Sequence, residues 1–323
     1  MTWLLLVALL LSWFVFRVRA NRRLVRPSVL DEEGRPYERF EVRLSDGSTV
    51  PLIDTGSGEA DPSRPAVLLI PGADGMRETW RYQIPALARR FRVLAPDLRT
   101  DIPDGATFDL LCRDAAEILD ARGVSSAVVV GQSLGGAIAL RFALLFAERV
   151  EGLVVANSLA RVSYEHVGLN RTLLVPVAMA TTRYFPTVVA RWLARLWSRL
   201  EVWMFDRSPG SERVIDYALW TGPRTVPARV SSARVDLLKD EDLRPRLAEI
   251  RAPTLVVKGP RDHYVPPVWS REVAGLIPGA RYVEVPGTGH VSHVSMPDTF
   301  NRILLEWLDE IGVTADSTEA ARE

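Results

Sequence analysis

The chain has 323 residues, 47% of them apolar and 25% charged, a composition typical of a packed globular protein and not of a disordered or collagen-like chain. Its 40 basic and 40 acidic residues cancel, so it lacks the net positive charge that would attract a polyanion, and no nucleic-acid partner is expected. The single cysteine, Cys112, excludes an internal disulfide framework and a cysteine-only metal cluster.

The chain begins with an apolar segment. Every residue of Trp3–Phe16 except Ser12 is apolar, and five arginines lie within the next ten residues. A secretory signal peptide carries its positive charge before the apolar run, whereas here the charge comes after it. We therefore favour a retained membrane anchor with a basic flank, residues 1–26, over a cleaved signal peptide or a buried core helix. Basic residues on the C-terminal side favour a cytoplasmic location for the rest of the chain.

The length of this segment leaves its placement in the lipid bilayer open. As a helix, the 14 residues Trp3–Phe16 span about 21 Å, against roughly 30 Å for the hydrocarbon core. A helix extended to Val18, with the Arg17 side chain reaching the headgroups, comes closer to spanning a thin bilayer. The alternative is a helix that lies in the membrane interface.

After a polar linker, short strands alternate with helices. Residues 37–44 and 49–54, around the turn Asp46-Gly47, predict a β-hairpin. Continuous apolar runs predict strands that are buried on both faces, at residues 66–70, 91–95, 127–130, 153–156, 255–257 and 282–285. Helical patterns lie between or after them, the clearest at residues 108–121, 137–147 and 299–311. The alternation predicts an α/β fold with a mostly parallel central sheet and helices on both faces.

Residues 159–250 interrupt this alternation with helical runs and no convincing strand. The clearest run is Pro186–Phe205, where large apolar side chains recur at helical spacing, at Trp192, Leu193, Leu196, Trp197, Leu200 and Trp203. Such a stripe is typical of core packing, and the alternative is a lid whose apolar underside covers a pocket. We predict a helical lid at 159–250 between two parts of one core, residues 37–158 and 251–312. The polar residues 313–323 predict a disordered tail.

One motif carries nucleophilic chemistry. The sequence Gly131-Gln132-Ser133-Leu134-Gly135 has the form G-x-S-x-G and lies between a predicted strand and a predicted helix. In that context the serine lies on a sharp turn at a helix N-terminus, where free N–H groups favour developing negative charge. The alternatives are an incidental serine and a phosphate-binding turn. A phosphate loop would have G-x-G-x-x-G or a terminal Gly-Lys, and both are missing here. Ser133 is therefore the candidate nucleophile.

A serine nucleophile needs a base and an acid that orients the base. Of the four histidines, His290 lies on a glycine-rich loop between the last predicted strand and the last predicted helix, so it is the candidate base; the others are His166, His263 and His293. Asp262 follows the predicted strand at 255–257 and is the candidate acid. Asp97 also ends a strand, but it precedes the serine, and we expect it to cap a loop or a helix.

The sequence resembles the α/β-hydrolase fold family at three motifs, which follow one another in the family's order. They are the G-x-S-x-G turn around Ser133 (the nucleophile elbow), G-x-x-D-x-x-V-P with Asp262, and G-x-G-H with His290. The resemblance covers about residues 40–312 and is closest to the lid-bearing esterases, lipases and C–C hydrolases. It implies an oxyanion hole made by the backbone N–H groups of Leu134 and Ala73.

The sequence departs from the family pattern in two loops. Many members have His-Gly where this chain has Pro71-Gly72, so the hydrogen bonds of that histidine are lost. The usual Asp-x-x-Gly-x-Gly after the fourth strand is replaced by residues 97–101, which contain no glycine. Neither departure changes the serine, the acid or the base.

The resemblance implies a serine hydrolase that cleaves a small, apolar acyl ester through an acyl-enzyme intermediate, with no cofactor and no metal. A C–C bond or lactone hydrolase and a cofactor-free haloperoxidase-like enzyme are the alternatives within the family. A serine at the elbow argues against epoxide hydrolase and haloalkane dehalogenase chemistry, which need a carboxylate nucleophile. A non-catalytic, membrane-tethered binding protein on the same fold is the alternative from another class. The sequence specifies no oligomeric state.

Overall fold

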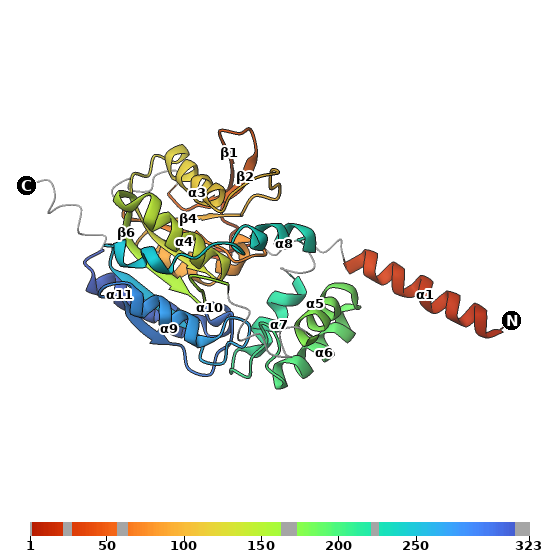
Figure 1. The fold of residues 1–323 in the computed structure, drawn as a ribbon. Coiled ribbons are helices and arrows are strands. Elements are labelled where there is room, and N and C mark those ends of the chain that lie inside the picture. The colour runs from red at the N-terminus through yellow and green to blue at the C-terminus, as the bar shows by residue number, and fades with distance from the viewer. Residues whose placement is uncertain (1, 22–27, 57–63, 163–172, 221–225, 314–323) are drawn as a thin grey trace, which may run out of the picture.

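The computed structural model describes residues 2–21, 28–56, 64–162, 173–220 and 226–313 (Figure 1). The described residues form one sheet of eight strands in the order β1-β2-β4-β3-β5-β6-β7-β8. The strands are β1 (Arg39–Arg43), β2 (Thr49–Asp54), β3 (Ala66–Ile70), β4 (Arg92–Pro96), β5 (Ala127–Gln132), β6 (Val150–Ala156), β7 (Thr254–Lys258) and β8 (Arg281–Glu284).

The sheet is mostly parallel, as predicted. The predicted hairpin is present as the antiparallel pair β1 and β2, and β2 also runs antiparallel to β4. From β4 to β8 every neighbouring pair is parallel, with Ile70 beside Gly131 and Gln132 beside Ala156. The carboxyl ends of β3, β5, β6 and β7 therefore meet at one edge, where ligand sites of parallel sheets lie.

Helices cover both faces of the sheet. Alternate residues of a strand point to opposite faces, and Leu68 and Val129 belong to one buried cluster whereas Val67 and Val128 belong to another. The first cluster includes residues of α3 (Asp109–Ala121), α4 (Leu134–Leu145) and α9 (Pro267–Leu276). The second includes residues of α2 (Gln83–Ala88) and α11 (Pro297–Glu310). Both sides of the sheet are thus packed, which explains the continuous apolar strands.

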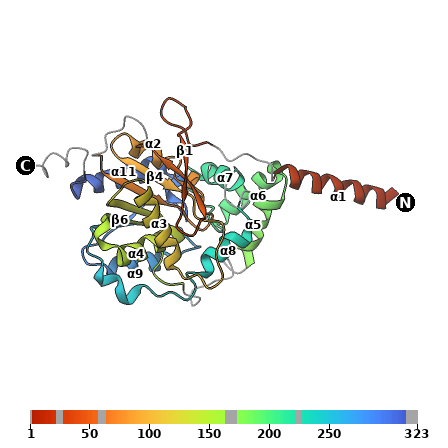
Figure 2. The ribbon, with the colours of Figure 1, turned by 90° about the horizontal axis from the view of Figure 1, so that it is seen from above.

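A helical insertion separates β6 from β7. Its described helices are α5 (Val175–Tyr184), α6 (Thr187–Arg199), α7 (Ser211–Trp220) and α8 (Ala228–Asp236), and they gather on the side of the molecule from which α1 projects (Figures 1 and 2). Residues of α5, α6 and α7 share a core of their own with Val294 of α10 (Ser292–Ser295). Short 3₁₀ segments complete the fold: η1 (Arg77–Trp80), η2 (Ala147–Arg149) and η5 (Arg244–Glu249).

The apolar stripe predicted for one helix at 186–205 is divided in the structure. Helix α6 ends at Arg199, because Glu201 and Trp203 adopt positive φ angles of 52° and 59°. The small residues of α6 face inward, at Ala190, Ala194 and Ser198. Trp192 is therefore 66% exposed, while Trp203, beyond the helix, is buried. The prediction of a single core-facing stripe is wrong, since periodicity does not tell which face of a helix is buried.

The N-terminal segment forms the helix α1 (Thr2–Asn21), which extends away from the globular part (Figures 1 and 2). The ring of Phe14 contacts the ring of Phe185 at the junction of α5 and α6, with 5.9 Å between centroids. Among the described residues, no helix combines the length and the apolar character needed to cross a membrane. The expectation of a transmembrane helix is therefore not supported. Of the predicted disordered tail at 313–323, residues 314–323 lie outside the described residues.

Candidate active site

Ser133 lies on a strained turn between β5 and α4. Its backbone has φ 55° and ψ −121°, which a residue with a side chain adopts only where the surroundings enforce it. The surroundings here are glycines, because a Cβ at Gly131 would overlap the carbonyl oxygen of Gly135 and a Cβ at Gly135 would overlap that of Ile70. Close packing of β5, α4 and β3 thus holds the serine at the carboxyl edge of the sheet.

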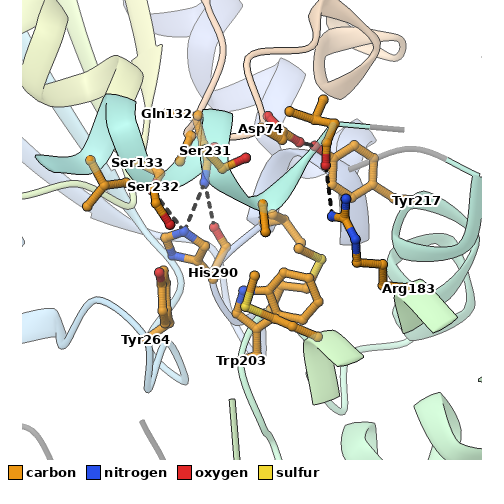
Figure 3. Close-up of a pocket in the computed structure, with 18 of the residues that line it drawn as sticks. Asp74, Gln132, Ser133, Arg183, Trp203, Tyr217, Ser231, Ser232, Tyr264 and His290 are labelled. Carbon is orange, nitrogen blue, oxygen red and sulfur yellow. Dashed lines mark hydrogen bonds between the residues drawn. The ribbon is translucent and has the colours of Figure 1, made fainter. Parts of the chain in front are cut away.

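The structure brings the three predicted side chains into one hydrogen-bonded series. His290 Nε2 lies 3.0 Å from Ser133 Oγ, and His290 Nδ1 lies 2.9 Å from Asp262 Oδ2. All three residues are buried, and Ser133 and His290 still line a pocket, in which Figure 3 shows them side by side. This is the geometry in which a histidine accepts the proton of a serine while a carboxylate fixes its tautomer.

The Asp262 carboxylate is fully buried and receives hydrogen bonds at both oxygens. Oδ1 accepts the backbone N–H groups of Tyr264 at 3.0 Å and Val265 at 2.8 Å. Oδ2 accepts Lys258 Nζ at 2.5 Å and Asn157 Nδ2 at 3.2 Å, in addition to the imidazole of His290. Burial alone would raise the pKa of Asp262, but the charges and hydrogen bonds of His290 and Lys258 hold it well below its usual range. The group is therefore a permanent anion near neutral pH.

Lys258 was not predicted as part of the site. Its ammonium group is fully buried and also donates to the carbonyl oxygen of Val265 at 2.6 Å. Burial lowers the pKa of Lys258, and the charge of Asp262 opposes that shift. The available sequence signal was a lysine directly after the apolar run at 255–257 and four residues before the acid.

Two amides hold the loop that carries His290. Asn157, which follows β6 with a positive φ of 48°, donates to the carbonyl oxygen of Gly289 at 2.9 Å and accepts the Ser292 hydroxyl at 2.7 Å. Gln132 donates to the carbonyl oxygen of His290 at 3.0 Å. Sequence reasoning missed both roles, because each contact joins residues more than 130 positions apart.

The remaining histidines lie elsewhere. His293 is buried, and its Nε2 is 2.8 Å from the Thr79 hydroxyl. Burial, with smaller contributions from the charges of His290 and Arg81, lowers the pKa of His293 to about 3. His263 is half exposed beside Glu201, and His166 is outside the described residues.

The residues of the predicted oxyanion hole lie next to the serine. Leu134 is the first residue of α4, where backbone N–H groups have no partner within the helix. Ala73 lines the pocket with Ser133, in a turn that the N–H of Gly75 closes on the carbonyl oxygen of Gly72 at 2.8 Å. Asp97, the rejected acid, caps the neighbouring segment by accepting the Arg77 N–H at 3.0 Å.

The pocket has a volume of about 320 Å³ and lies between the sheet edge and the helical insertion. Its apolar wall includes Met179, Trp203, Met204, Tyr264 and Val291. Its polar wall includes Asp74, Arg183, Tyr217, Ser231 and Ser232, which Figure 3 labels. Asp236 also belongs to this wall. The Tyr217 hydroxyl donates to Asp74. Within the described residues, no cluster of three or more histidine, cysteine or acidic side chains is arranged to hold a metal ion.

Comparisons with known proteins agree with this fold. The sequence model of a family described as "alpha/beta hydrolase fold" matches residues 65–297. The chain belongs to the α/β-hydrolase family. It is 32% identical over 261 residues to an Azorhizobium caulinodans protein named "Putative carbamate hydrolase RutD", covering 76% of this chain and 91% of that protein.

Two further α/β hydrolases illustrate the range of chemistry among similar proteins. The 2-hydroxy-6-oxo-6-phenylhexa-2,4-dienoate hydrolase of Burkholderia cepacia is 30% identical over 272 residues, covering 80% of this chain and 90% of that protein. The solved structure of a thermophilic esterase from Thermogutta terrifontis superimposes with a TM-score of 0.64 at 26% identity, covering 85% of this chain and 99% of that one.

Lys258 Nζ is one of the groups that compensate the fully buried carboxylate of Asp262. We predict that Lys258→Met, which leaves this carboxylate less well paired, lowers the free energy of unfolding by about 3–5 kcal/mol in urea at neutral pH. Lys239→Met, at the only other lysine, which is exposed, serves as the control and should leave the free energy of unfolding unchanged. Equal stability of Lys258→Met and the native protein would contradict this role.

His293 predicts a pH dependence of stability. Its pKa is about 3 in the folded protein against 6.5 for an ordinary histidine, so between these values the unfolded chain binds a proton that the folded chain does not. This group therefore makes stability fall as pH falls from 6.5 towards 3, by up to about 1.4 kcal/mol per pH unit. We expect a shallower loss in His293→Gln than in the native protein or His263→Gln, measured by urea unfolding across this range. Equal slopes in all three would refute the prediction.

Proposed function

We propose that this protein is a serine hydrolase that cleaves a small carboxylic ester with an apolar acyl group. The observation that carries the proposal is the series Ser133 Oγ, His290, Asp262, with successive distances of 3.0 and 2.9 Å at the floor of a pocket. A buried carboxylate, an oriented imidazole and a serine at a helix N-terminus are the parts that activate a hydroxyl for attack on a carbonyl.

The reaction follows from the positions of these groups. Ser133 Oγ attacks the acyl carbonyl carbon while His290 Nε2 takes its proton, and Asp262 stabilises the imidazolium. The backbone N–H groups of Ala73 and Leu134 receive the oxyanion, a contribution of about 3–4 kcal/mol per donor in comparable sites. The imidazolium then protonates the leaving alkoxide, which departs and leaves an acyl-enzyme. His290 next removes a proton from water, which attacks the acyl carbonyl. The imidazolium then returns this proton to Ser133 Oγ as the bond from the serine to the acyl carbon breaks and the acid is released.

The pocket supports a small substrate. Its volume of about 320 Å³ is near the lower end of ligand sites, and thioether and aromatic side chains form one wall. Three helices of the insertion line the outer side of the pocket, through Met179 of α5, Tyr217 of α7 and Ser231 of α8. We interpret the insertion as the lid over the acyl site.

A second candidate function is hydrolysis of a carbon–carbon bond. It is supported by the 30% identity to the dienoate hydrolase of Burkholderia cepacia, a protein of which the chain covers 90%. The same serine, base and acid serve either reaction, so the fold does not choose between them.

Hydrolysis of p-nitrophenyl esters tests the proposed function. We expect kcat/KM to be higher for the acetate and butyrate than for the decanoate, because the pocket is small. Ser133→Ala should lower kcat at least about 10⁴-fold without loss of folding. Ser126→Ala, at a partly exposed serine outside the pocket, is the matched control and should retain activity. Ester turnover that survives in Ser133→Ala would refute the assignment. Ser133-dependent hydrolysis of the dienoate, with no ester turnover, would favour the second function.

We further propose that α1 holds the enzyme at the cytoplasmic face of a membrane. Large apolar side chains of α1 are exposed, with Trp3 at 78% and Leu4 at 76%. On the neighbouring helix α6, Val188 is 76% and Trp192 66% exposed. Arginines follow α1, as expected on the cytoplasmic side of a membrane. A helix that is apolar all round needs an apolar environment, and a lipid surface supplies one.

Flotation with vesicles of phosphatidylcholine and phosphatidylglycerol tests this placement. The full chain should float with the vesicles, and the double variant Leu5→Asp, Leu9→Asp should stay in the dense fraction, because charges within the apolar helix oppose its insertion into lipid. Ser133→Ala is the control and should float like the native protein. Native protein that remains in the dense fraction would contradict the proposal.

A further inference from the structure

Arg234 of α8 is a buried cation outside the Ser133, His290, Asp262 series. Its side chain is only 1% exposed and donates five hydrogen bonds to carbonyl oxygens of the described residues. Nη1 donates to Ala73 at 3.2 Å and Asp74 at 2.9 Å. Nη2 donates to Leu98 at 2.7 Å and Arg99 at 2.6 Å, and Nε donates to Arg99 at 2.9 Å. A guanidinium has five N–H donors, so these carbonyls use its full capacity.

These carbonyl groups belong to two loops, and they are the loops in which the sequence departs from the family pattern. Residues 72–75 follow β3 and contain Ala73, the predicted oxyanion donor. Residues 97–101 follow β4 and lack the usual glycines. One backbone hydrogen bond also joins the loops, from the Leu98 N–H to the carbonyl oxygen of Gly75 at 3.0 Å. Arg234 thus forms hydrogen bonds with both of the loops in which the sequence departs from the family pattern.

Gly75 makes room for this guanidinium. Its φ is +65°, a conformation that side chains rarely adopt, and a Cβ there would overlap Nη1 of Arg234. The turn that presents Ala73 and the site that receives Arg234 therefore depend on the same glycine.

The negative charges near Arg234 favour its protonated form. Burial lowers the pKa of the guanidinium, while the negative charges of Asp74 and Asp97 oppose that shift. An arginine stays protonated under all ordinary conditions. A buried cation that lost these carbonyl partners would incur a large desolvation penalty, so the two loops and α8 are held in one arrangement.

We propose that Arg234 is the positioning residue of the oxyanion loop, and that through it the helical insertion sets the direction of the Ala73 N–H. The proposal rests on the proposed function of Ser133. The same short helix lines the pocket with Ser231 and Ser232 and anchors the oxyanion loop with Arg234. Displacement of α8 from the sheet edge would open the pocket and release the oxyanion loop together. Full catalytic power would then require α8 to be docked.

The test compares Arg234→Met and Arg234→Lys with Arg229→Met, an exposed arginine on the same helix. Loss of one aligned oxyanion donor costs about 10²–10³ in kcat. We expect a decrease of that size in Arg234→Met with KM changed less than about threefold, a smaller decrease in Arg234→Lys, and no change in Arg229→Met. Added guanidinium at non-denaturing concentration should partly restore kcat in Arg234→Ala.

A second readout separates positioning from a purely structural role. An alkylboronic acid forms a tetrahedral adduct with the serine and occupies the oxyanion site, so its affinity should weaken in Arg234→Met by a factor similar to the fall in kcat. Binding of the product acid should be unchanged.

Unaltered kcat and boronate affinity in a folded Arg234→Met would overturn the proposal. So would a loss that appears only as a raised KM and a lowered Tm, without rescue, because that pattern marks a simple tether. If Arg234→Met does not fold, the same readouts in Arg234→Lys decide. If the native protein neither hydrolyses esters nor binds the boronate, the proposed function fails first, and the role of Arg234 fails with it.

Discussion

A carboxylate that solvent cannot reach needs hydrogen-bond donors and positive charge from the protein around it. Asp262 is such a group, and its donors come from several loops at the carboxyl edge of the sheet. The donors that surround it come from the end of β7 and the loop that follows it, from the loop after β6 and from the loop after β8. Removing any one of them leaves a buried charge less well paired, which is costly in a low-dielectric interior. The hydrogen bond to the buried Asp262 carboxylate therefore fixes the imidazole of His290, and this places its Nε2 within hydrogen-bond distance of Ser133 Oγ.

The rest of the molecule divides into a rigid part and a part built upon it. The parallel strands are packed on both faces, and the strained backbone of Ser133 persists because close contacts between glycine backbones leave it no alternative. The helical insertion has its own small core and contributes the outer wall of the pocket. Arg234 joins the two parts at the loop that carries Ala73. Catalytic geometry on this account is a property of the core, and its completion depends on the insertion.

Sequence patterns predicted what local chemistry determines. Continuous apolar runs marked the strands, glycine spacing marked the elbow of Ser133, and chain order marked Asp262 and His290. The roles of Lys258 and Arg234 were not predicted, because they depend on contacts that only the fold creates. Arg234 forms hydrogen bonds with residues at least 135 positions away. The exposed face of α6 was also misread, because small residues at Ala190 and Ala194 took the buried side, and periodicity alone does not reveal this. Hydropathy identified α1 as apolar without establishing that it spans a membrane.

Labelling with a fluorophosphonate, followed by mass mapping of the adduct, tests the central claim most directly, because this reagent reacts with an activated serine and not with ordinary hydroxyl groups. The account predicts one adduct in the native protein, on Ser133, and none in Ser133→Ala. An unlabelled Ser133 in folded native protein, or equal labelling of Ser133→Ala at another residue, would contradict the claim that Asp262 and His290 activate Ser133.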